Sequence, residues 1–201
     1  YKIVINKPTT SDDVTVVSTL DIDNNLNIDG GNLDINGNTV DVAGAIDITG
    51  KLTMINAAAI LKAGTSVTWR SGSSSYILGG LFTFNTLWSF MDGTSAMLAG
   101  TNTVKVVGSQ PSIIQHKDAD ARMNNLVIEK TGSLTTLDET SAFPLRLNED
   151  LTVKSGNTLR VLNADVWLAG TFLAESASTI MLASGGSIDA GTLAIKNTIN
   201  A

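Results

Sequence analysis

The sequence predicts an all-β fold, a right-handed parallel β-helix (β-solenoid) of roughly ten short three-faced coils. The first indication is composition: 43% of the 201 residues are hydrophobic but only 16% are charged. Low charge together with many Gly, Ser, Thr and Asn residues is typical of β-structure with frequent turns. The second is a pair of aliphatic residues, separated by one residue, that recurs every six or seven positions. The third is the Gly or Asn that lies between successive pairs.

The aliphatic pairs begin at Leu20. Each is expected to be a very short strand, because alternate side chains of a strand point to opposite faces and both aliphatic members can point inward. Gly and Asn between the pairs supply corners, since these residues adopt positive φ readily. The N-terminal pairs are Leu20/Ile22, Leu26/Ile28, Leu33/Ile35, Val40/Val42, Ile46/Ile48 and Leu52/Met54.

The shortness of these strands favours a coil over a β-sandwich, whose strands usually have about five or six residues. Three walls of six or seven residues make a coil of about 20 residues. A chain of 201 residues then holds about ten coils, stacked at about 4.8 Å each.

The same pattern returns in the second half of the chain. The region 69–125 is less regular and rich in aromatics, so we expect wider coils there, with longer strands and a loop from Gln115 to Met123. Residues 1–19 are predicted to form an N-terminal strand or arm, and residues 20–201 the solenoid. The later pairs are Leu126/Ile128, Leu145/Leu147, Leu151/Val153, Leu159/Val161, Val166/Leu168, Ile180/Leu182 and Leu193/Ile195.

Charge and cysteine content exclude several classes of function. The chain has no cysteine, which excludes disulfides, thiolate metal sites and cysteine nucleophiles. Its net charge is −6, of which −5 falls in residues 1–60, so nucleic-acid binding is not expected. No stretch reaches the roughly 18–20 apolar residues of a membrane-spanning helix, so membrane insertion is not expected either.

Catalytic chemistry finds little support in the residues. His116 is the one histidine, and its polar neighbours predict a solvated loop residue. No G-x-S-x-G motif accompanies it. We therefore expect no enzyme, no catalytic residue and no cofactor. A run of aspartates could align on one outward face as a solvated surface, with weak Ca²⁺ binding as the alternative. These aspartates are Asp21, Asp23, Asp34, Asp41 and Asp47.

In four segments, the pattern of residues and their spacing resembles that of a known group of proteins. They are Val104–Ser109, Asn124–Gly132, Leu145–Val153 and Trp167–Phe172. Over about residues 80–195 the chain resembles the repeat regions of very large secreted bacterial surface proteins. That resemblance implies a β-solenoid adhesin, stalk or fibre component located outside the cell or on its surface.

The two ends lack an amphipathic capping helix and both end in predicted strand, so each solenoid edge is expected to pair with something. The main functional hypothesis is a non-catalytic structural subunit of an extracellular filament, stalk or surface fibre. Copies would join head to tail through these edges, with a donated N-terminal strand as one version. The alternative is that these 201 residues belong to a longer covalent solenoid. The residues predicted for self-assembly are Tyr1, Ile3, Ile5, Leu193, Ile195 and Ile199.

Two alternatives remain open. One is a surface adhesin that binds glycans, with Trp88, in the apolar run Leu87–Met91, as the ligand-facing aromatic. The competing interpretation is that the central aromatics fill the core where the coils widen. The other alternative is a polysaccharide-degrading β-helix enzyme that uses clustered carboxylates.

Overall fold

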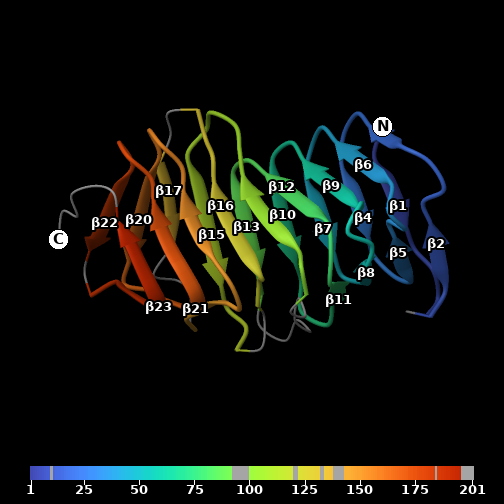
Figure 1. Cartoon of the computed structure of the whole chain (residues 1–201). Coiled ribbons are helices and arrows are strands. Elements are labelled where there is room, and N and C mark those ends of the chain that lie inside the picture. The colour runs from blue at the N-terminus through green and yellow to red at the C-terminus, as the bar shows by residue number, and fades with distance from the viewer. Residues whose placement is uncertain are drawn as a thin grey trace.

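The computed structural model describes residues 1–9, 11–91, 100–119, 122–131, 134–137, 143–183 and 185–195, without the side chains of residues 136 and 137. Within these ranges the protein is all-β and has no helix. The strands stack in successive parallel coils, with β1, β2 and β3 at one end of the rod and β22 and β23 at the other (Figure 1). The predicted β-solenoid is therefore confirmed.

The strands of the described residues form three walls. Sheet A is the first wall: β1 (Ile3–Ile5), β4 (Leu26–Ile28), β7 (Ile46–Ile48), β10 (Ser66–Trp69), β13 (Leu87–Phe90), β15 (Ser112–His116), β17 (Leu134–Leu137), β20 (Thr158–Leu162) and β22 (Thr179–Ala183). Sheet B contains β2 (Asp13–Thr15), β5 (Asn32–Asp34), β8 (Lys51–Met54) and β11 (Ser74–Ile77).

The remaining wall is sheet C. It contains β3 (Leu20–Ile22), β6 (Thr39–Val42), β9 (Ile60–Ala63), β12 (Leu81–Phe84), β14 (Thr103–Val106), β16 (Asn125–Ile128), β19 (Leu151–Val153) and β21 (Asp165–Ala174), with β18 (Leu145–Leu147) and β23 (Ser187–Ile195) also paired to β21. In the first coils, a strand of sheet B follows each strand of sheet A along the chain. In the last coils this place is taken by β18 and by the first halves of β21 and β23.

The solenoid has about eight turns, fewer than the ten predicted. The coils begin at the expected length: Ile46 pairs with Leu26, 20 residues before it. Later coils are longer, and Ile114 pairs with Trp88 at a distance of 26 residues. The aliphatic pairs fix the walls but not the connections between them, so the coil length drifts upward and fewer coils fit in the chain.

The core is built from residues that lie one above another in register. The column that starts at Ile5 passes through Ile28 and Ile48 and then changes to Trp69 and Phe90. The larger rings fit because the neighbouring wall, sheet B, carries a smaller side chain in the same coil. Sheet B places Ser75 where the preceding coil has Leu52, and the Ser75 hydroxyl accepts a hydrogen bond from the Trp69 indole nitrogen at 2.6 Å.

Glycines serve the corners in two different ways. Gly31 has a φ of 76°, the left-handed conformation predicted for a corner. Gly64 is required for a different reason, since a Cβ there would lie 2.1 Å from the backbone oxygen of Ala43 in the preceding coil. Close stacking of the coils therefore depends on a residue without a side chain at that corner.

The predictions for residues 1–19 and for His116 need correction. Residues 1–19 are not a separate arm, because β1 pairs in parallel with β4 and β2 with β5, so they supply walls of the first coil. His116 is not a solvated loop residue: it ends β15, is fully buried and packs edge-on against Phe90 at 5.6 Å between ring centroids. It occupies the inward column that starts at Ile5.

Candidate functional site

The N-terminal end of the rod exposes a cross-section of the core. Here β1, β2 and β3 are the terminal strands of their three sheets. Their side chains and the following loop enclose an apolar hollow of about 260 Å³. We call this surface the N-terminal rim; it is formed by Ile3, Val14, Val16, Val17 and Leu20. Val17 is 84% exposed, so the rim presents aliphatic surface to solvent.

The other end of the described chain is also aliphatic. We call it the C-terminal rim and define it by Leu182 on β22 and by Leu193 and Ile195 on β23. Leu193 is 61% exposed, whereas Phe172, its partner in the preceding coil, is buried. Among the described strands, β22 pairs only with β20 and β23 only with β21, so each keeps one unpaired edge.

The two rims terminate the same columns of residues. The column that begins at Ile3 runs through Leu26, Ile46 and the following coils and ends at Leu182. The column that begins at Leu20 ends at Leu193. A second copy placed in register at the end of the first would therefore continue both columns with aliphatic side chains.

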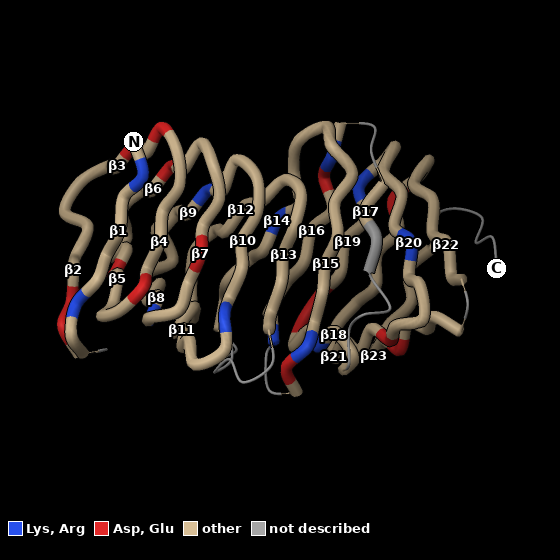
Figure 2. The backbone as a smooth tube through the Cα atoms, turned by 180° about the vertical axis from the view of Figure 1, so that it is seen from behind, with Lys and Arg blue, Asp and Glu red and all other residues tan. Residues whose placement is uncertain are grey.

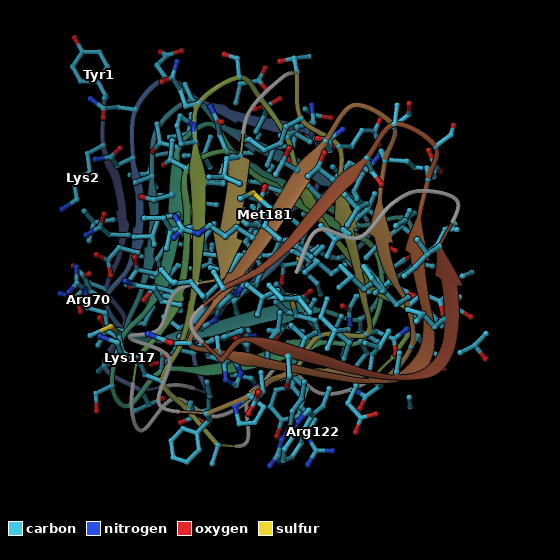
Figure 3. All side chains as sticks on the ribbon, turned by 90° about the vertical axis from the view of Figure 1, so that its left-hand side faces the viewer. Tyr1, Lys2, Arg70, Lys117, Arg122 and Met181 are labelled. Atoms are coloured by element: carbon cyan, nitrogen blue, oxygen red, sulfur yellow. The ribbon has the colours of Figure 1, made fainter. Side chains whose placement is uncertain are left out.

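The structure separates the residues predicted for self-assembly. Tyr1 is fully exposed and projects from the rod (Figure 3), and Ile3 is half-buried at the N-terminal rim. Ile5 is buried and belongs to the core, and it also lines the hollow at the N-terminal rim. Ile199 lies outside the described residues. Sequence reasoning missed the hollow beside β1, although the aliphatic pair Val14 and Val16 was a signal for an additional wall before Leu20.

Trp88 cannot serve as the ligand-facing aromatic, because it is fully buried. Its ring lies 4.5 Å from Trp69, 4.9 Å from Phe82 and 5.2 Å from Phe84 between centroids. The competing interpretation, core filling by the central aromatics, is correct for these residues. Two described aromatics do reach the surface of a wall: Tyr76 on β11, which is 43% exposed, and Trp167 on β21, which is 45% exposed.

The five aspartates do not all align on one face. Asp21 and Asp41 are register partners on sheet C, and Asp23 lies in the bend after β3, whereas Asp34 lies on sheet B and Asp47 on sheet A. Figure 2 shows acidic and basic residues interspersed along the rod. Two of these aspartates form ion pairs with the next coil: Asp41 with Lys62 at 2.7 Å, and Asp47 with Arg70 at 2.5 Å. No group of three or more His, Asp or Glu side chains placed to hold a metal occurs within the described ranges.

The ion pair with Asp47 is bidentate, since both Nε and Nη2 of Arg70 donate to its carboxylate. The hydrogen bond and the charge of Asp47 raise the pKa of Arg70. These side chains fasten adjacent coils on the outer surface, and because they are largely exposed their contribution to stability is small.

One cation is buried inside the rod. The ammonium group of Lys130 donates to the backbone oxygens of Val107, at 2.7 Å, and Asn85, at 3.0 Å. It also donates to the Ser112 hydroxyl at 2.5 Å. Burial lowers the pKa of Lys130 to about 8. Its acceptors come from two earlier coils, so Lys130 links three levels of the solenoid.

A surface hollow of about 530 Å³ lies on the outside of sheet C. Each charged group that lines it forms an ion pair: Lys105 with Glu129 at 2.8 Å, and Lys154 with Glu175 at 2.7 Å. Hydrogen bonding and the charge of Glu175 raise the pKa of Lys154. Paired charges of this kind fasten neighbouring coils and are not poised for proton transfer.

Comparison with known proteins gives no assignment: no protein-family model, curated protein or solved structure matches this chain. In the part of the chain that the structure describes, there is also no helix with the length and hydrophobicity needed to cross a membrane. The rims and the outer walls are therefore the features on which a function can be argued.

Proposed function

We propose that this chain is a non-catalytic structural unit of an extracellular filament, stalk or surface fibre, and that copies stack head to tail through the two rims. The observation that carries the proposal is the match between the rims: the columns that start at the aliphatic residues Ile3 and Leu20 end at the aliphatic residues Leu182 and Leu193. The location outside the cell rests on the resemblance to secreted surface proteins.

Stacking would satisfy two unmet requirements at once. An unpaired strand edge presents N–H and C=O groups that can pair with another strand. The aliphatic side chains at the rims lose water contact when covered, and full burial of one is worth roughly 1.5–3 kcal/mol. A contact that joins unlike ends does not close on itself, so it generates a filament.

The N-terminal strand has a defined part in this arrangement. Since β1 is already paired with β4, donating it to another subunit would break that pairing. We therefore propose that β1 stays in its own coil and offers its free edge to β22 of the next copy. This version needs no rearrangement of the first coil.

The proposal is tested by placing a charge on one rim at a time. Val17→Glu blocks the N-terminal rim and Leu193→Glu blocks the C-terminal rim; both side chains are exposed, so folding should be preserved. Sedimentation velocity and negative-stain electron microscopy should show polymers for the parent chain and monomers for each variant. Ile113→Glu, which alters an exposed residue on β15 in the middle of the rod, is the matched control and should still polymerise.

Mixing the two rim variants sharpens the test. Each retains one intact rim of the opposite kind, so a mixture should form heterodimers and stop there. Monomers at all concentrations of the parent chain would refute assembly through these rims. Polymers of the two rim variants as long as those of the parent chain would place the contact elsewhere.

A further inference from the structure

A row of polar and aromatic side chains lies on the outer side of the rod near its C-terminal end. Arg146 on β18 pairs in register with Trp167 on β21, and Trp167 pairs with Asp189 on β23. Met123 bridges to Leu147 in the same wall, which places Arg122 next to Arg146. The row Arg122–Arg146–Trp167–Asp189 therefore contributes one residue per coil.

The row faces solvent because its neighbours face the core. Val166 and Leu168, on either side of Trp167, are buried, whereas Trp167 itself is 45% exposed. Figure 3, a view along the rod, shows Arg122 projecting from the lower wall. At about 4.8 Å per strand, the row extends roughly 14 Å along the rod.

The row lines a surface hollow of about 350 Å³, to which Asn148 and Gly191 also contribute. The hollow lies where β21 changes from one wall to the next, since its pairing with β23 shifts register between Leu168 and Thr171. Such an irregularity changes the direction in which side chains of the strand point, and it is often found next to a functional site. A Cβ at Gly191 would lie 2.3 Å from the backbone oxygen of Ala169, so this side of the hollow has no side chain.

Two polar atoms near Trp167 have no hydrogen-bond partner within the described part of the chain. Arg146 places its guanidinium carbon 5.3 Å from the centre of the indole ring, yet its Nε is shielded from solvent and has no hydrogen-bond partner there. The side-chain nitrogen of Asn148 is in the same situation. Shielded donors without acceptors are costly, so the hydrogen-bonding capacity of Arg146 and Asn148 is not fully used beside the hollow.

We propose that this hollow binds an acidic polysaccharide. An indole offers an apolar face to the C–H groups of a sugar ring, while a guanidinium recognises a carboxylate through two parallel hydrogen bonds. Trp167 supplies the platform and Arg146, next to it, supplies the carboxylate-binding group, with Arg122 one coil further along the row. Asp189 and Asn148 complement sugar hydroxyl groups.

An acidic sugar polymer fits better than a neutral one because the row carries two cations and one carboxylate. Neither arginine forms an ion pair with a described residue, in contrast to Arg70 and the paired lysines of sheet C. The site is on a side wall, so its failure to bind would leave the proposed end-to-end assembly untouched. Along a filament, it would recur once per copy.

The test uses oligogalacturonate hexamer as the acidic probe, with cellohexaose as the neutral probe and poly-glutamate as a polyanion that is not a sugar. Trp167 gives an internal reporter, since Trp69 and Trp88 are fully buried. We expect saturable binding of the hexamer by calorimetry and protection of Trp167 fluorescence from acrylamide quenching. Binding of cellohexaose and poly-glutamate should be at least about tenfold weaker.

Variants separate the parts of the site. Trp167→Ala and Arg146→Gln should each weaken hexamer binding by at least about tenfold, while Tyr76→Ala, an exposed aromatic paired with Lys51 on another wall, should leave it unchanged. Equal binding of poly-glutamate would reduce the effect to charge alone and overturn the proposal. So would hexamer binding that persists in both Trp167→Ala and Arg146→Gln, or no binding by the parent chain.

Discussion

Replacement of Trp88 by alanine tests the position of the aromatic core most directly. The side chain is fully buried and its ring lies within 5.6 Å, between centroids, of Trp69, Phe82, Phe84 and Phe90. Removing a buried Trp usually costs about 3–5 kcal/mol, through lost burial and the cavity that remains. With four ring contacts we expect a loss of roughly 4 kcal/mol.

The matched control is Trp167→Ala, which removes the same side chain from a half-exposed position. Its cost should stay below about 1 kcal/mol, because surface substitutions rarely exceed that value. Trp88→Phe should cost less than Trp88→Ala, since it keeps a ring and removes a buried indole N–H that has no acceptor among the described residues.

The assay is urea unfolding, followed by tryptophan fluorescence and by circular dichroism for the whole rod. The fluorescence reports Trp69 and Trp88 in the aromatic coils together with Trp167 on β21. Because each coil contacts only its neighbours, the fluorescence midpoint of Trp88→Ala should fall by more than the circular dichroism midpoint. If Trp88→Ala and Trp167→Ala shift the fluorescence midpoint equally, Trp88 is not at the centre of a packed core and the reasoning fails.

Two further changes test the contacts between coils. Burial lowers the pKa of Lys130 to about 8, below its unfolded value, so the free energy of unfolding of the parent chain should rise between about pH 8 and 10.5, by up to about 3 kcal/mol. Lys130→Met should remove that rise in unfolding experiments across this range, whereas Lys105→Met on the outer surface should retain it; a rise that survives in Lys130→Met would refute the assignment. Gly64→Ala should destabilise the rod by about 1–3 kcal/mol, since its Cβ would meet the Ala43 oxygen, and an unchanged melting temperature would mean that the coils are not so closely stacked.

The walls of the solenoid could be predicted because each aliphatic pair marks one short strand with two inward-facing side chains. Leu20/Ile22 became β3 and Leu193/Ile195 lies in β23. The number of coils could not be predicted as well, since the connections vary freely. The step from Trp88 to Ile114 takes 26 residues, whereas the step from Leu26 to Ile46 takes 20.

The orientation of the aromatics was a different problem. In β13 both Leu87 and Trp88 are apolar, so alternation alone does not say which one faces inward. In β21 the signal was present, because Trp167 stands between Val166 and Leu168 and must therefore face outward if they face inward. His116 was also within reach: it has the same parity as the inward residue Ile114 in β15.

The asymmetry of the rod bears on how copies would meet. Joining unlike ends continues the parallel pairing of every sheet, whereas joining two N-terminal rims would set β1 antiparallel to its own copy and break the columns that start at Ile3 and Leu20. Electrostatics acts in the same direction, because residues 1–60 carry −5 of the total charge of −6. Two N-terminal ends would repel each other, while an N-terminal end meets a nearly neutral C-terminal one. Backbone geometry and charge therefore both favour the open, head-to-tail contact over a closed dimer.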